Sequence, residues 1–99
     1  MTTSADADPR ALAVDVSVTA TSLSVRLADG RTVSVPTDWF PRLVHASEAE
    51  RRAWTLIGDG SGIHWPAVDE DISVSALIAG ERSNESPPSL RRWLDSRQE

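Results

Sequence analysis

The 99-residue sequence contains no cysteine and no lysine. Without cysteine the chain cannot form disulfides, thiolate zinc sites, iron–sulfur ligands or a cysteine nucleophile. Without lysine it cannot use Schiff-base chemistry, nor a Walker-type phosphate loop, in which a lysine binds the phosphates. The missing cysteine also fits a reducing compartment.

Positive charge of any kind is scarce, because ten arginines face fifteen acidic residues and the net charge is −5. Such a chain repels phosphate backbones and anionic membrane surfaces, so we expect neither direct nucleic-acid binding nor membrane association. No apolar run approaches the roughly 18 residues of a membrane span, and the polar N-terminus lacks the features of a signal peptide. The expected location is the cytoplasm.

The length suits one small domain with polar ends. Residues 1–10 have no apolar stripe and are predicted to be a disordered leader. An α+β domain is predicted over residues 11–80, followed by a linker rich in Ser, Asn and Pro over 81–88 and a terminal helix over 89–98.

Alternating apolar and polar residues predict three strands, over 12–18, 23–27 and 33–35. In the first of them the even-numbered apolar residues are expected to share the buried face. Asp29-Gly30 indicates a tight hairpin, through a type I′ turn or a bulge that places glycine at positive φ. The three runs therefore predict an antiparallel β-meander.

Short helices and further strands are expected beyond the meander. Thr37 or Asp38 is expected to cap a helical turn, and Ser47 with Glu50 has the spacing of a capping box for a helix that runs to about Trp54. One or two short strands follow, over 55–57 and 63–65, and then a helix capped by Ser73 that contains Ile72, Val74, Leu77 and Ile78 and stops at Gly80. The predicted fold is α+β, with two to three short helices.

The stretch 62–74 concentrates the residues that could do chemistry, namely His64, Asp69, Glu70 and Asp71. A zinc or iron site needs further ligands, and the other histidine, His45, lies on a different element. The acids lack the spacing of an EF-hand. We therefore expect no metal and no cofactor.

Two interpretations of these residues stay open. In the first, His64 is a general base oriented by Asp69 or Asp71, with Ser61 or Ser73 as a nucleophile. In the second, the stretch is structural: residues 63–65 form a strand, and the three acids precede a helix whose N-terminal dipole favours negative charge. The glycine run 58–62 lies in a chain too short for the sheet that a serine elbow requires.

Four tryptophans are the main aromatic content. Trp39, Trp54 and Trp65 lie within or beside apolar patterns, which favours packing in or near the core. Trp93 shares one face of the terminal helix with Leu90 and Leu94. A ten-residue helix is marginal by itself, so this face needs a docking surface on the domain or on a partner.

Three stretches together suggest a family: the segment 23–36, then Trp-Phe-Pro-Arg-Leu at 39–43, and Gly-Ile-His-Trp-Pro at 62–66 followed by Asp-Glu-Asp-Ile-Ser at 69–73. Over roughly residues 12–80 the chain resembles the DUF2442 family of small bacterial proteins.

The resemblance implies a small α+β domain and an antitoxin-like protein whose gene lies beside that of a DUF4160 protein. It transfers no catalytic residues. Some members carry a helix-turn-helix DNA-binding domain after this module, but the nineteen residues after Gly80 are too few for one.

The leading hypothesis is thus a non-enzymatic protein-interaction module of antitoxin type with a partner protein, for which a DUF4160-like protein is the candidate. One alternative is a small enzyme or ligand-binding protein that uses His64 with Asp69 or Asp71. Another is a self-associating structural module, which would form a homo-oligomer. The candidate interface residues are Trp39, Arg42, His64, Trp65, Asp69, Glu70, Asp71 and Trp93.

Overall fold

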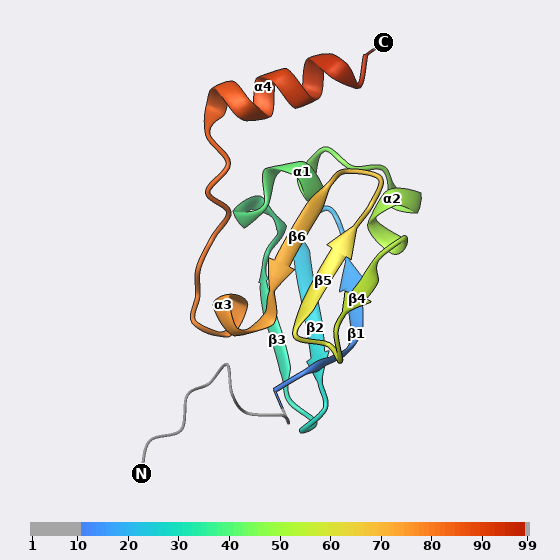
Figure 1. Cartoon of the computed structure of the whole chain (residues 1–99), viewed down its shortest axis with the longest axis vertical. Helices are drawn as coiled ribbons and strands as arrows, with labels where there is room; N and C mark the ends of the chain where they lie inside the picture. The colour runs from blue at the N-terminus through green and yellow to red at the C-terminus, as the bar shows by residue number, and fades with distance from the viewer. Residues whose placement is uncertain (1–10, 99) are drawn as a thin grey trace.

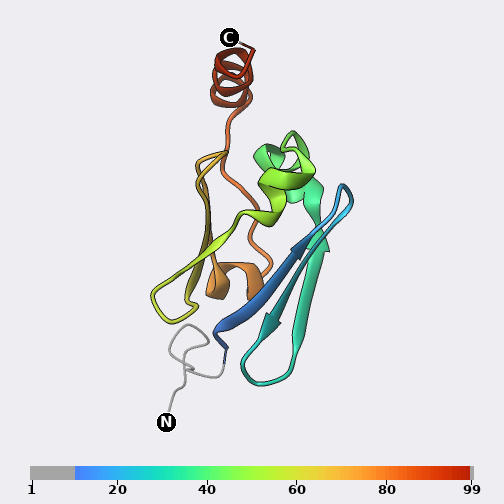
Figure 2. The same cartoon turned by 90° about the vertical axis from the view of Figure 1, so that its right-hand side faces the viewer.

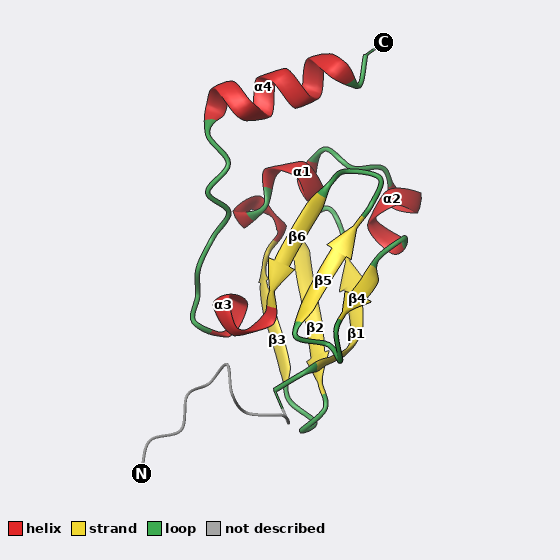
Figure 3. Ribbon diagram, in the orientation of Figure 1, coloured by secondary structure: helices red, strands yellow, loops and turns green. Residues whose placement is uncertain are grey.

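A computed structural model describes residues 11–98 and contains two three-stranded antiparallel sheets (Figures 1 and 3). In each sheet the strands lie in chain order. The predicted leader over residues 1–10 lies outside the described residues. The first sheet consists of β1 (Ala13–Val18), β2 (Ser22–Leu27) and β3 (Thr32–Pro36), and the second of β4 (Thr55–Ile57), β5 (Gly62–Trp65) and β6 (Glu70–Ser73).

Short helices lie at the ends of these sheets, and the sheets form two facing layers (Figure 2). The helical elements are η2 (Thr37–Trp39), α1 (Pro41–Val44), α2 (Glu48–Arg52), α3 (Val74–Ile78) and α4 (Pro87–Ser96). The predicted α+β class and the β-meander are confirmed, and the described helices number four besides the 3₁₀ turn η2. Within residues 11–98 no helix is both long and apolar enough to cross a membrane.

The core fills the space between the two sheets. Leu23, Val25 and Leu27 of β2 are buried on one side, and Ile63 and Trp65 of β5 on the other. The indole of Trp65 is fully buried, yet its N–H donates a hydrogen bond of 3.1 Å to a backbone carbonyl at the end of α2. The predicted core packing of this tryptophan is therefore confirmed.

The hairpin between β2 and β3 has the predicted glycine. The amide of Gly30 donates to the carbonyl of Leu27 at 3.0 Å, and the Leu27 amide donates to the carbonyl of Arg31 at 2.8 Å. Gly30 has a φ of +95°. This is a three-residue loop with a glycine bulge, one of the two turns that the Asp29-Gly30 pair predicts.

The expected alternation in β1 is wrong at Val14. Ala13 pairs with Leu27 and Asp15 pairs with Arg26, so Val14 is the extra residue of a β-bulge. The bulge turns Val14 outward, where 47% of it is exposed, and puts the small Ala13 into the core instead. The backbone of Ala13 is also fixed by the turn between β4 and β5, because its amide donates to the carbonyl of Gly60 at 2.8 Å.

The helix starts are partly as predicted. Ser47 and Glu50 form the predicted capping box, but α2 ends at Arg52 rather than near Trp54. Neither Thr37 nor Asp38 caps a helix: Thr37 is buried, and its hydroxyl donates to the carbonyl of Thr19 at 2.9 Å. The buried hydroxyl thus ties η2 to the turn between β1 and β2.

The C-terminal elements differ from the prediction at their starts. Ser73 caps α3 as predicted, but Ile72 belongs to strand β6. Gly80, with a φ of +82°, follows α3 and its amide donates to the carbonyl of Leu77, which is a typical helix end. Helix α4 begins at Pro87, two residues before the predicted start, because proline suits the first helical turn.

Candidate functional site

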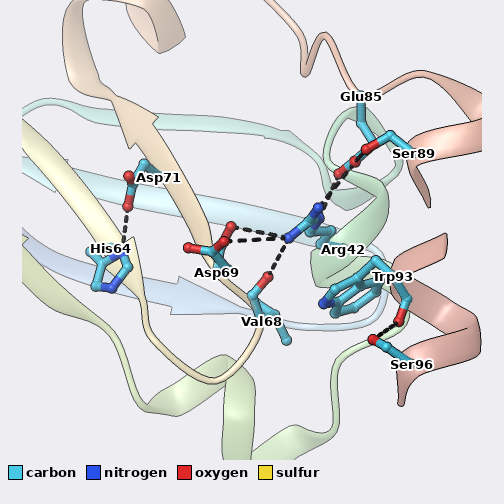
Figure 4. Close-up of polar contacts among 9 residues, drawn as sticks. All are labelled: Arg42, His64, Val68, Asp69, Asp71, Glu85, Ser89, Trp93 and Ser96. Carbon is cyan, nitrogen blue, oxygen red and sulfur yellow. Dashed lines mark hydrogen bonds and ion pairs between the residues drawn. The ribbon is translucent and has the colours of Figure 1, made fainter. Parts of the chain in front are cut away.

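His64 and Asp71 face each other across neighbouring strands. They are paired residues in the register of β5 and β6, and His64 Nδ1 contacts a carboxylate oxygen of Asp71 (Figure 4). Because a carboxylate only accepts hydrogen bonds, Nδ1 is the donor, and Nε2 is left with its lone pair in the neutral ring. Thr55 is the residue opposite His64 on β4. Thr55, His64 and Asp71 therefore form one row across the sheet.

This row lies on the outer face of the second sheet, because Ile63 and Trp65 point from the same strand into the core. Ile57 lies on this outer face too. Its side chain approaches the backbone of Gly62, since a Cβ atom added there would be 3.3 Å from Ile57 Cδ1. Ile57 nevertheless remains 44% exposed. We call Thr55, Ile57, His64 and Asp71 the outer-face patch.

Asp69 belongs to a separate cluster built around Arg42 of α1. The Arg42 guanidinium donates to the backbone carbonyls of Val68 at 3.1 Å and Asp69 at 3.3 Å, so it holds the turn between β5 and β6 (Figure 4). The Asp69 carboxylate is 3.9 Å from Arg42 and largely exposed. Asp69 itself has a φ of +52°, a conformation that aspartate tolerates better than most residues.

Arg42 also anchors the segment that leads to α4. Its Nε donates to Glu85 Oε1 at 2.6 Å and its Nη2 to Glu85 Oε2 at 3.1 Å, a two-pronged ion pair between nearly buried side chains. The hydroxyl of Ser89 donates to the same carboxylate. The hydrogen bonds from Arg42 hold the pKa of Glu85 below its usual range, and those to Glu85 raise the pKa of Arg42.

Trp93 docks on the domain of its own chain. The guanidinium of Arg42 lies 5.1 Å from the centroid of the Trp93 ring, and that of Arg97 lies 4.6 Å from it. Arg97 in turn pairs with Glu50 of α2 at 2.7 Å. Trp93 packs against the edge of the core, whereas Leu90 stays half-buried outside the core cluster. The indole thus packs in cis, against the edge of the core and against the guanidinium groups of Arg42 and Arg97.

The interpretation of residues 69–71 as a helix entry is wrong. Glu70 and Asp71 form the start of strand β6, and α3 begins only at Val74. The strand alternation sends the two side chains in opposite directions. Asp71 points outward to His64, while Glu70 points inward and is only 9% exposed.

Among Asp69, Glu70 and Asp71, only Glu70 is buried. Burial raises the pKa of Glu70 to about 7, and the negative charges of Glu85, Asp71 and Asp69 add to the rise, against the attraction of Arg42. Nothing in the sequence distinguishes Glu70 from its two acidic neighbours. The inward direction of its side chain follows only from its place in strand β6. Trp65 and Glu70 are both buried, which removes them from the candidate interface.

The remaining predicted residue, Trp39, lies between the domain and the segment after α3. The guanidinium of Arg82 is 4.7 Å from the centroid of its ring, and its carbonyl accepts from the Ser83 amide at 3.0 Å. The candidate interface residues thus fall into several places rather than one. Among residues 11–98, no group of three or more His, Asp or Glu side chains is arranged to hold a metal ion.

The family's sequence pattern matches residues 13–83. The chain belongs to the DUF2442 family. This is a family of proteins of unknown function, and its match covers both sheets and α3 but ends before Glu85 and α4. The predicted family is therefore confirmed, and the terminal helix lies outside the family match.

A solved structure supports the same fold. The crystal structure of a protein of unknown function from Rhodospirillum rubrum is similar to this chain, with 28% sequence identity and a TM-score of 0.63. The similarity covers 75% of this chain and 92% of the other. Among curated proteins, none matches the chain significantly. These comparisons assign no activity.

Proposed function

We propose that this chain is a non-enzymatic protein-interaction module of antitoxin type, and that its partner protein binds the outer-face patch. The observation behind the proposal is the exposed Ile57 on the same sheet face as His64 and Asp71, in the neighbouring row of the register. An apolar side chain ringed by polar groups is the usual composition of a protein contact.

The charge of the chain favours a basic partner. The net charge is −5, and the carboxylates of Asp71 on the patch and of Asp69 in the turn before β6 are exposed. Opposite charges on two partners increase the rate of encounter and select the orientation. A DUF4160-like protein encoded by the neighbouring gene is the partner that the family resemblance implies, and the test begins with that gene product.

The test is co-expression of the chain with the neighbouring gene product, followed by pull-down and a growth assay. We expect a complex and rescue of growth. Replacing Ile57 with Arg is expected to weaken binding at least about tenfold, since it inserts a charge into the contact. The matched control is Ser34→Arg, the same new side chain on the exposed face of the other sheet.

Thermal melts monitored by circular dichroism verify that both variants are folded. Failure to form a complex, together with no effect on growth, rejects the antitoxin proposal. Equal binding by the Ile57→Arg variant and the wild type would move the contact away from the outer-face patch. His64→Ala then shows whether the imidazole belongs to the interface.

A second candidate, a small hydrolytic site, is favoured by the contact between His64 Nδ1 and Asp71. This contact orients the imidazole as in a general base, and Thr55 stands opposite it. If this is the function, an activated ester is hydrolysed by the wild type and not by His64→Ala. His45→Ala is the control, because it removes the other, exposed histidine.

A further inference from the structure

Within residues 11–98, no strand pairs with the outer edge of β1 over residues 15–19. In the described chain β1 pairs with β2, and the Thr19 amide donates to the carbonyl of Ser22 at 2.9 Å. Hydrogen-bonded pairs alternate along an antiparallel ladder. Val16 and Val18 therefore direct their amides and carbonyls away from β2, toward the edge of the sheet. Such a row of backbone groups is a template for another strand.

A hollow of about 430 Å³ lies along this edge. It is lined by residues 16–20 on the β1 side and by Glu48, Arg51, Arg52 and Trp54 on the other. At the opposite end of the strand, the bulge leaves Val14 exposed to solvent. One strand edge thus presents an apolar side chain at one end and a hollow at the other.

We propose that β1 pairs with β1 of a second copy of this chain, antiparallel and around a two-fold axis at Ser17. The sequence Val16-Ser17-Val18 is symmetric about that axis. In this register Val16 of each copy lies opposite Val18 of the other, so the outward amides and carbonyls of both residues are paired. A two-fold axis makes each of these contacts twice.

The side chains fit the same register. Asp15 lies opposite Thr19 of the second copy, which avoids a pair of like charges and brings a carboxylate toward the hollow that Arg51 and Arg52 line. Val14 lies opposite Ala20, at the end of the edge where the hollow is located. The exposed valine of one copy therefore meets the hollow of the other, and this self-complementarity favours a second copy over an unrelated strand.

The proposed pairing also fits the side chains on the exposed face of the first sheet. Ser17, Ser24 and Ser34 form one row across β1, β2 and β3, and the hydroxyls of Ser24 and Ser34 are 2.8 Å apart. Pairing at Ser17 extends this row of small polar side chains over six strands. The contact lies on the first sheet and the outer-face patch on the second, so the dimer goes beyond the proposed function and is tested separately.

Cross-linking tests the register directly, because the chain has no native cysteine. At the axis, Ser17 of the two copies forms a non-hydrogen-bonded pair, with Cα atoms about 4.5 Å apart, within disulfide range. We expect Ser17→Cys to give a covalent dimer under mild oxidation. The matched control, Ser34→Cys, lies in the same row but at the far edge of the sheet, and it should remain largely monomeric.

The mass in solution is the second measurement. Sedimentation equilibrium of the full chain should give twice the 10.7 kDa monomer mass as concentration rises. Ser17→Arg places two positive charges opposite each other and should weaken the dimer by about tenfold or more, whereas Ser34→Arg should not. If Ser17→Arg does not fold, the comparison of cross-linking by Ser17→Cys and Ser34→Cys tests the dimer.

Results of three kinds would overturn the proposal. The first is a monomer at every concentration up to about 1 mM, which means a dissociation free energy below about 4 kcal/mol. The second is a dimer that Ser17→Arg leaves intact or equal cross-linking by the two cysteine variants. The third is a monomer whose β1 amides become protected from hydrogen exchange only when the partner protein is added, because the edge would then bind a strand of that partner.

Discussion

Replacing Glu70 with Gln should stabilise the fold at neutral and alkaline pH relative to acidic pH. Glu70 is buried, and its pKa rises from 4.5 to about 7. Below pH 4.5 the carboxyl is protonated in both the folded and the unfolded chain. Between pH 4.5 and 7 the unfolded chain releases this proton while the folded chain keeps it, so ionisation increasingly favours unfolding.

The magnitude follows from the size of the pKa shift. At about 1.4 kcal/mol per pKa unit, the rise of Glu70 corresponds to a loss of up to about 3 kcal/mol in unfolding free energy between pH 4.5 and pH 8. A glutamine side chain at this position has no proton to release and keeps a similar shape. The difference between Glu70→Gln and the wild type should therefore grow in favour of the variant across this window.

The assay is urea unfolding of both proteins at pH 4.5, 6 and 8. Glu50 and Glu85 have lowered pKa values, through hydrogen bonds from Arg97 and Arg42, so their stabilising effect is lost only as pH falls below 4.5. Their titration thus lies outside the window. Glu81→Gln, at an exposed position, controls for the loss of one carboxylate. An equal difference at all three pH values would refute the raised pKa of Glu70.

Further substitutions test the contacts that hold the sheets and α4 together. Gly60→Ala should cost more than about 3 kcal/mol, because the new Cβ would lie 2.3 Å from the Ala13 carbonyl oxygen, whereas Gly30→Ala, with the same sign of φ and open space, should cost about 1 kcal/mol in thermal or urea unfolding. Trp65→Phe should cost about 2 kcal/mol or more in the same assay, through the lost hydrogen bond and the cavity. Arg42→Ala should release the segment before α4 and speed tryptic cleavage within that helix, followed by mass spectrometry, and unchanged cleavage would show that Arg42 does not anchor it.

The sequence predicts those parts of the fold that depend on local chemistry. The glycine bulge at Gly30 and the capping box of Ser47 are as expected, because each is a short-range arrangement of backbone and side chain. The burial of Trp65 is also local, since it follows from its place in an alternating strand. Membership of the DUF2442 family follows from motifs that can be found without the structure.

The rest depends on contacts between distant segments. The bulge at Val14 follows from the backbone of Ala13 bonding to Gly60, 47 residues along the chain, and no local pattern marks it. The sequence predicts that Asp69, Glu70 and Asp71 together precede a helix. In the structure a turn and a strand direct them to Arg42, to the interior and to His64 respectively. Three consecutive acids therefore have three environments.

Arg42 shows how the terminal helix is attached to a domain that the family shares. Its contacts with the carbonyls of Val68 and Asp69 lie within the family match, and its ion pair with Glu85 lies beyond it. One guanidinium has five N–H donors, enough to hold a turn and still bind a carboxylate. The segment that carries α4 is therefore held by a cation that the domain also uses elsewhere. Glu85 binds the arginine that fixes the turn, and Trp93 stacks against the same guanidinium.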